Sequence, residues 1–284
     1  MPVTTRRQAA STNGKSHHDN DYKSVGVFTH IDWNSTFIQN YMIDPTRIFS
    51  ILCIVIIISR YVVSENNNPL AAFTGFLLHP VVLGSCGIAS FVWYLAKQHA
   101  PSKALPIYDC WVVEWYWWNA WLFHAVMDGA SGTFHLVPAV VQQYFVLDKR
   151  FETHHTVPWL VGLIELVGMA PLCLMTLYAV RVQSPLRFPL EIVTSTFHAF
   201  GMLMFVFAEV YEGQLNVPAL DPVGVPGNRW ANVKYLDLYH LVYYWFGFWF
   251  CNLVWGFVPY YRIKRAVEEC RASFEQTSKT NKVA

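Results

Sequence analysis

The chain has 284 residues, of which 54% are hydrophobic and only 14% carry a charge. Because soluble domains carry about 25% charged residues, this composition argues against a water-soluble enzyme and favours a protein embedded in lipid. The formal net charge is only +1, so the chain lacks the basic excess that would neutralise a phosphate backbone. Nucleic acid is therefore excluded as a main partner.

The N-terminal segment, residues 1–45, begins with the polar sequence MPVTTRRQAASTNGKSHHDNDYKS. This stretch lacks the early apolar core and the small-residue cleavage site of a secretory signal. We therefore predict a retained, disordered cytoplasmic tail.

Six apolar segments follow, each close to the length of about 20 residues that crosses a hydrocarbon core as a helix. They are residues 46–64, 70–96, 109–134, 157–180, 187–211 and 237–261. The pattern predicts an all-α, polytopic transmembrane helical bundle of about six spans over residues 46–265. Residues 266–284 are expected to form a polar C-terminal tail.

The distribution of Lys and Arg in the short flanking segments indicates the orientation of the spans. Basic residues gather in both terminal segments and in the second and fourth links, namely Arg6, Arg7, Lys15, Lys23, Arg47, Lys97, Lys103, Arg181, Arg187, Arg262, Lys264, Arg265 and Arg271. Fewer lie in the third and fifth links, which hold Lys149, Arg150, Arg229 and Lys234. We expect an integral membrane protein with both termini in the cytoplasm.

Ionisable side chains inside the spans are the main candidates for a site, because such groups are costly in lipid and usually face the interior of the bundle. They are Glu114, His124, Asp128, Glu165, Glu191, His198 and Glu209. His124 and Asp128 are four residues apart and share one helix face, so the carboxylate can support the imidazole as a proton donor. The alternative is that these groups only join helices by hydrogen bonds.

Two further pairs share a helix face. Glu191 and Glu209 lie on the face of His198 but near the ends of their span, where contact with interfacial water would explain them equally well. Asn252 and Trp255 are three residues apart in the last span. An amide can orient a bound molecule, and the face of an indole can stabilise a developing cation.

Metal and nucleotide signatures are absent from the sequence. The HisHis pairs at 17–18 and 154–155 have no partner boxes of the HxxxH kind, and no HExxH, Gly-rich phosphate loop or GxSxG motif occurs. We expect neither a metal ion nor a cofactor, which leaves proton transfer, ligand binding or transport.

Three segments carry a family resemblance. They are FHAVMDG at 123–129, SPLRFPLEIV at 184–193 and YWFGFWFCNLVWGFVP at 244–259. In these segments the chain resembles the emopamil-binding protein family, the membrane domain shared by sterol Δ8–Δ7 isomerase and the sigma-2 receptor group. The likeness covers about residues 109–265 and implies five spans, so the segment 46–64 is additional, and nothing in it suggests chemistry.

The resemblance implies roles for individual residues. His124, Asn252 and Trp255 match a His, an Asn and a Trp that line the sterol cavity of the isomerase. Asp128 stands where the isomerase has Glu, one methylene longer. The catalytic Glu of the next span falls on Gly162, whereas Glu165 lies three residues on, about 4.5 Å along a helix axis.

The expected function is an isomerase that shifts a double bond, or rearranges a sterol-like or terpenoid-like polycyclic lipid, through a carbocation. His124 supported by Asp128 would be the acid, Glu165 the base or relay, and Trp255 the cation stabiliser. Asn252, His198 and Glu209 would bind the substrate.

Two alternatives stay open: a paralogous membrane isomerase or cyclase of a non-sterol metabolite, and a membrane protein that binds sterol or lipid without turnover. The resemblance further implies the endoplasmic reticulum, and the sequence leaves a homodimer open.

Overall fold

The computed structural model describes residues 44–65, 68–102, 105–217 and 238–283, and its regular elements within these ranges are all helices. The predicted N-terminal tail, residues 1–45, lies almost entirely outside the described residues. A boundary after Tyr41 separates that segment from the unit that contains the helices.

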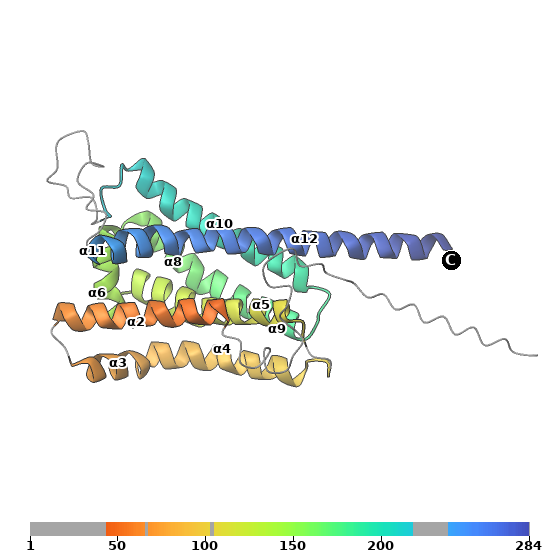
Figure 1. Ribbon diagram of the computed structural model, residues 1–284, viewed down its shortest axis with the longest axis horizontal. Coiled ribbons are helices and arrows are strands. Elements are labelled where there is room, and N and C mark those ends of the chain that lie inside the picture. Colours follow the sequence, from red (N-terminus) through yellow and green to blue (C-terminus); the bar gives the residue numbers. More distant parts are fainter. Residues whose placement is uncertain (1–43, 66–67, 103–104, 218–237, 284) are drawn as a thin grey trace, which may run out of the picture. The chain divides into compact units, whose positions relative to one another are not determined.

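The described chain consists of helices, most of which Figure 1 labels, and they are of two kinds. Among the described residues most are α-helices, and three are the wider π-helices, labelled η, which close their turns through i→i+5 hydrogen bonds. In order they are α2 (Pro45–Glu65), α3 (Pro69–Leu77), α4 (Pro80–Gln98), α5 (Ile107–Trp118), η1 (Asn119–Thr133), α6 (Pro138–Leu147), α7 (Lys149–Glu152), α8 (Thr156–Ile164), η2 (Glu165–Met169), α9 (Ala170–Arg181), α10 (Arg187–Tyr211), α11 (Leu238–His240), η4 (Leu241–Phe250) and α12 (Cys251–Val283).

Five helices of the described chain are long and apolar enough to cross a membrane. They are Pro45–Glu65, Pro80–Gln98, Thr156–Arg181, Arg187–Tyr211 and Leu238–Glu275. These helices confirm an all-α, polytopic membrane protein. The predicted tail at 266–284 continues as helix, because α12 extends to Val283.

The predicted span 109–134 is a continuous helix, formed by α5 and η1, but it is not among those five. Nearly every residue of η1 is buried, and η1 packs against α4, α6, α8, α9 and η2. Because this helix is surrounded by protein rather than lipid, it tolerates the polar side chains that make it less apolar than its neighbours.

The predicted span 70–96 is interrupted at Leu78 and His79, where α3 ends and α4 begins. The His79 side chain caps α4 by accepting a hydrogen bond from Val81 N at 3.3 Å. Pro80 occupies the first position of the helix, where its missing N–H costs nothing. The break therefore has a local cause that hydropathy alone does not register.

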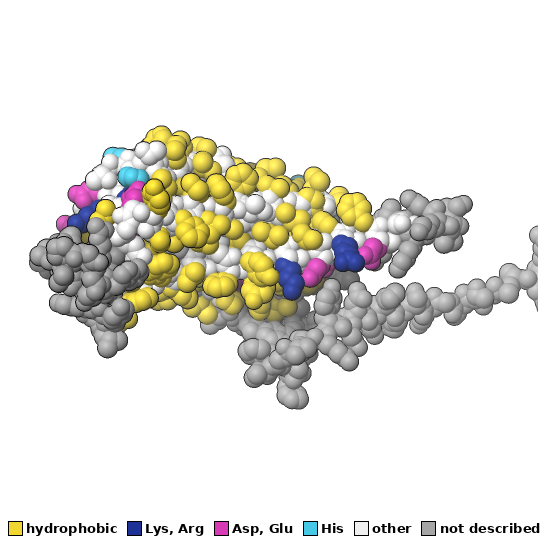
Figure 2. Space-filling view, turned by 90° about the horizontal axis from the view of Figure 1, so that it is seen from above, with side chains coloured by type: hydrophobic (Ala, Val, Ile, Leu, Met, Phe, Trp, Pro, Cys, Tyr) yellow, Lys and Arg dark blue, Asp and Glu magenta, His cyan; other side chains and the backbone are white. Residues whose placement is uncertain are grey.

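The outer faces of the bundle are apolar. Large hydrophobic side chains are exposed along α2, α4, α10 and α12, among them Val55, Phe91, Phe207 and Phe257. Figure 2 shows hydrophobic side chains over the middle of one face and charged side chains toward its ends. This distribution matches a surface that contacts lipid tails between two polar boundaries.

Two buried ionic clusters lie at opposite ends of α10. Glu191 lies 3.9 Å from Arg262, and Glu209 lies 3.2 Å from Arg150. The two glutamates are eighteen residues apart, about 27 Å along a helix, which is close to the hydrocarbon thickness of about 30 Å. His198 lies between them, seven residues from Glu191 and eleven from Glu209.

Candidate functional site

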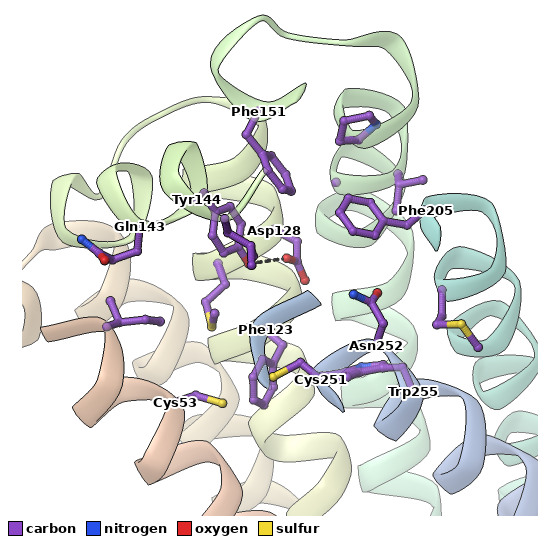
Figure 3. Close-up of a pocket in the computed structure, with 18 of the residues that line it drawn as sticks. Cys53, Phe123, Asp128, Gln143, Tyr144, Phe151, Phe205, Cys251, Asn252 and Trp255 are labelled. Carbon is purple, nitrogen blue, oxygen red and sulfur yellow. Dashed lines mark hydrogen bonds between the residues drawn. The ribbon is translucent and has the colours of Figure 1, made fainter. Parts of the chain in front are cut away.

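A cavity opens inside the bundle between α2, η1, α6, α8, α10 and the junction of η4 with α12. Most of its lining is apolar, and the polar groups are few. Figure 3 shows Asp128, Tyr144, Asn252 and Trp255 around this space. A dry, concave site with a few convergent polar groups is typical of a small-molecule site.

A pair of carboxyl groups forms one polar region of the cavity. Asp128 from η1 and Glu165 from η2 both line it. Asp128 Oδ1 accepts a 2.6 Å hydrogen bond from the Tyr144 hydroxyl, the dashed line in Figure 3. Glu165 lies against Gly201, where a Cβ atom would come 3.6 Å from its Oε1 atom. The small residue leaves room for the carboxyl group.

A pair of imidazoles adjoins the carboxyl groups. His124 Nε2 and His198 Nε2 are 2.8 Å apart, so one ring donates a hydrogen bond to the other. His124 Nδ1 lies 3.9 Å from Glu165 Oε1. The donor atoms of His124, Asp128 and Glu165 all fall within 4.8 Å of one another. The arrangement places an imidazole and two carboxyl groups, the usual residues of general acid–base chemistry, close to one another.

The two imidazoles differ in their access to the cavity. His198 lines it, whereas His124 is 1% exposed and is not among the lining residues. His124 therefore adjoins the cavity through its neighbours in this structure, and its expected role as the acid stays a prediction. His124 lies behind His198 and Glu165, a relation between three helices that the spacing within one helix does not contain.

Trp255 lines the cavity in a fixed orientation. Its Nε1 donates a 2.8 Å hydrogen bond to Asn119 Oδ1, and its ring packs edge-on against Phe123 with centroids 4.7 Å apart. Asn252 also lines the cavity, and its amide donates to Phe248 O at 2.6 Å. The structure thus brings together Asp128, Glu165, His198, Asn252 and Trp255.

Glu209 lies apart from the cavity, and its expected role in substrate binding stays a prediction. It does not line the cavity. Its carboxylate pairs with Arg150 and accepts hydrogen bonds from the backbone N–H groups of Asn216 at 2.8 Å and Val217 at 3.1 Å. Glu209 shares a helix face with His198, but eleven residues separate them by about 16 Å along the axis.

Gly162, where the family resemblance places a catalytic Glu, lies at a close helix crossing. A Cβ atom on Gly162 would come 2.3 Å from Thr133 Oγ1 and 2.6 Å from Asp128 O. Glycine therefore lets α8 approach η1, and the carboxyl group of this region comes from Glu165 instead.

Sequence reasoning missed the contribution of α2. Four of its residues line the cavity, namely Cys53, Ile56, Ile57 and Arg60, although no chemistry was expected from this segment. Arg60 could have indicated that α2 contributes to the site, because a charged residue inside an apolar span usually has a functional reason. Tyr144 and Gln143, in the short helix α6, carried no comparable signal.

Two groups of side chains among the described residues could hold a metal ion. They are His124 with Cys173 and His198, and His124 with Asp128 and Glu165. Both groups include His124. The expectation that no metal is needed stays a prediction.

Comparison with known proteins gives a family match for part of the chain. Residues 136–266 match the model of EBP, described as EXPERA, the expanded EBP superfamily. Glu165, His198, Asn252 and Trp255 fall inside the matched region, while His124 and Asp128 precede it. No curated protein gave a match. The match over residues 136–266 supports membership of the EXPERA superfamily.

Proposed function

We propose that the protein is an integral membrane isomerase that moves a double bond in a sterol-like polycyclic lipid through a carbocation. The observation that supports this proposal is the convergence of Asp128, Glu165, His198 and Trp255 on one apolar cavity. A hydrophobic ring system fits such walls, and the polar groups supply what the acid–base chemistry needs.

The reaction that we propose begins with a proton from the Glu165 carboxyl group. The π electrons of the substrate double bond form a new C–H bond with this proton, which leaves a carbocation on the neighbouring carbon. The Asp128 carboxylate removes a proton from an adjacent carbon, and the electrons of that C–H bond form the shifted double bond. Substrate and product are isomers, so no oxidant, reductant or cofactor is consumed.

The site then returns to its starting state by moving one proton from Asp128 to Glu165. Their carboxyl oxygens and His124 Nδ1 lie within 4.8 Å of one another, so the transfer can be direct or can pass through His124. In this scheme His124 is a positioning and relay residue rather than a group that touches the substrate. Positioned acids and bases typically contribute about 10²–10⁴-fold to the rate.

Trp255 would stabilise the intermediate. An indole face attracts a cation through its quadrupole, and the attraction strengthens when water is excluded. The hydrogen bond from Trp255 to Asn119 holds the ring in place before the charge develops. The apolar walls also keep water from capturing the cation.

A second candidate is supported by the crossing at Gly162. Because position 162 has no room for a longer side chain, the proton donor sits one helical turn from where the family resemblance places it. A donor at another position addresses another substrate carbon. This geometry favours a paralogous isomerase or cyclase that acts on a non-sterol terpenoid or polyketide-derived skeleton.

The test is expression in a cell strain that lacks sterol Δ8–Δ7 isomerase, with analysis of the sterols. Wild-type protein should produce Δ7 sterols, and Glu165→Gln and Trp255→Ala should lower their yield at least about tenfold at equal expression. Glu152→Gln changes an exposed carboxyl group that is not among the cavity-lining residues; it is the matched control and should behave as wild type. Unchanged Δ8 sterol with wild-type protein would reject the sterol activity, and binding without any product would favour the non-catalytic alternative.

A further inference from the structure

The cavity has a second polar region, formed by Arg60 of α2, Gln143 of α6 and Tyr243 of η4. None of these residues takes part in the acid–base chemistry proposed above. Arg60 is the lone Lys or Arg among the described residues that line the cavity. In Figure 3, Gln143 lies on the far side of Tyr144 from Asn252 and Trp255, so this region is set apart from the indole.

The hydrogen bonds of Tyr243 determine which groups remain available. Its hydroxyl accepts a 3.2 Å hydrogen bond from Arg60 Nε and donates a 2.6 Å hydrogen bond to Gln143 Oε1. The hydroxyl oxygen accepts the hydrogen bond from Arg60, and the hydroxyl proton is donated to the amide oxygen of Gln143. That contact fixes the orientation of the Gln143 amide, with the NH₂ group on the other side.

The Gln143 amide nitrogen is left without a partner. Gln143 is only 5% exposed, and its Nε2 atom makes no hydrogen bond among the described residues. Buried polar groups are nearly always satisfied, and leaving one unpaired costs about 1–3 kcal/mol. A bound molecule with an acceptor atom at this position would remove the cost.

Arg60 also lacks a charged partner. No carboxylate lies within ion-pair distance of its guanidinium among the described residues, and its other contact is with the face of the Tyr243 ring at 5.6 Å. Proximity to the end of α2 could explain Arg60 alone, since long basic side chains extend toward the membrane interface. It does not explain why the buried amide nitrogen of Gln143, which lines the same cavity, has no partner among the described residues.

The free groups are therefore all donors: the guanidinium N–H groups of Arg60 and the NH₂ group of Gln143. A hydroxyl group, which both donates and accepts, would leave its own proton unpaired there. A carboxylate only accepts, and it matches the charge and the forked geometry of a guanidinium.

We propose that Arg60 and Gln143 bind a carboxylate at one end of the polycyclic lipid substrate, apart from the reacting double bond. The inference rests on the proposed function for the reaction and adds the substrate class, an acidic rather than a purely neutral lipid. It also assigns a role to α2, the helix additional to the family's five spans.

The test is direct binding to the purified full chain in lipid nanodiscs. The probes are 5β-cholan-24-oic acid, its methyl ester and its 24-alcohol, which share one ring system and differ in the terminal group. The acid should bind about tenfold or more tightly than the alcohol, as a charge-assisted contact predicts. The ester, a neutral acceptor, should lie between them and separates the effect of charge from that of hydrogen bonding.

Variants assign the preference to the two residues. Arg60→Gln should abolish the preference for the acid and Gln143→Leu should reduce it, while Arg60→Lys should keep part of it. Lys97→Gln removes the same charge from α4, outside the cavity lining, and should leave the preference intact. Thermal unfolding of each variant without ligand verifies that it is folded.

The outcomes are separable from those of the isomerase test. Glu165→Gln should lose turnover and keep the preference for the acid, because binding needs no proton transfer. Equal binding of the three probes, binding of none, or a preference that persists in Arg60→Gln would each overturn the inference, whether or not the protein is an isomerase.

Discussion

Gly162 lies so close to Asp128 that a Cβ atom at position 162 would come within 2.6 Å of the Asp128 carbonyl oxygen. The contact joins η1, which carries Asp128, to α8, which continues directly into η2 and Glu165. The absence of a side chain at position 162 is thus a condition for the pairing of the two carboxyl groups.

Substitution of Gly162 should therefore destabilise the protein. Gly162→Ala forces Thr133 and Asp128 to move, and overpacking of this kind costs about 1–3 kcal/mol. Gly168→Ala is the matched control, because its nearest neighbour, Ile164 Cγ2, would lie at an ordinary 3.9 Å. Thermal unfolding in detergent measures both. Equal melting temperatures for the two variants would contradict the close crossing.

The double variant Gly162→Glu with Glu165→Gln tests the position of the proton donor. It restores the carboxyl group to the place implied by the family resemblance, but without the space to hold it. We expect no recovery of turnover relative to Glu165→Gln alone, measured by product formation. Recovery to wild-type rates would show that the helix crossing can open.

His198 and His124 should respond differently to substitution. His198→Ala removes a group from the cavity wall and should change both KM and kcat. His124→Ala should lower kcat by about tenfold or more with little change in KM, because His124 acts through Glu165 and His198. Steady-state kinetics with the active substrate distinguish the two patterns. A large rise in KM for His124→Ala would place this ring against the substrate.

Tyr144→Phe should lower turnover without unfolding the protein. The change removes the 2.6 Å hydrogen bond that orients the Asp128 carboxylate, while the ring keeps its contact with Phe151 at 4.5 Å. We expect kcat to fall by about tenfold, the usual effect of a positioned base that loses its support. Comparison of kcat with the melting temperature checks the prediction, and an unchanged kcat would remove Tyr144 from the mechanism.

Arg150 should matter for stability and not for substrate affinity. The guanidinium is fully buried between Asp148, at 2.7 Å, and Glu209, at 3.2 Å. Arg150→Met leaves two buried carboxylates without their counter-charge, which costs about 3–5 kcal/mol. The variant should unfold at a lower temperature, yet the fraction that stays folded should bind ligand as wild type does. A loss of ligand affinity without a loss of stability would instead indicate that Glu209 takes part in ligand binding.

Part of the fold could be predicted because it depends on local properties of the chain. The positions of the spans follow from hydropathy, and α2 and α10 match the predicted segments to within a few residues. The break at His79 was missed, since a cap followed by Pro80 ends a helix without changing how apolar the segment is.

The candidate site was predicted in its residue types more than in its arrangement. Spacing along one helix places His198 and Glu209 on the same face, but it does not say that only His198 meets the cavity. Nor does it say that His124 lies behind His198, or that Arg60 reaches the same space as Asp128. These relations depend on which helix packs opposite which, and on the depth of the crossing.

The sequence by itself determined that this chain lies in a membrane. It also determined which few polar groups the helix bundle would have to keep away from lipid. Both follow from the cost of transferring each side chain from water to lipid, a property of the residue and its near neighbours. The tertiary structure alone decided which of those groups share a cavity. That outcome depends on contacts between helices distant in sequence, such as the crossing at Gly162, where a few atoms set how closely two helices approach.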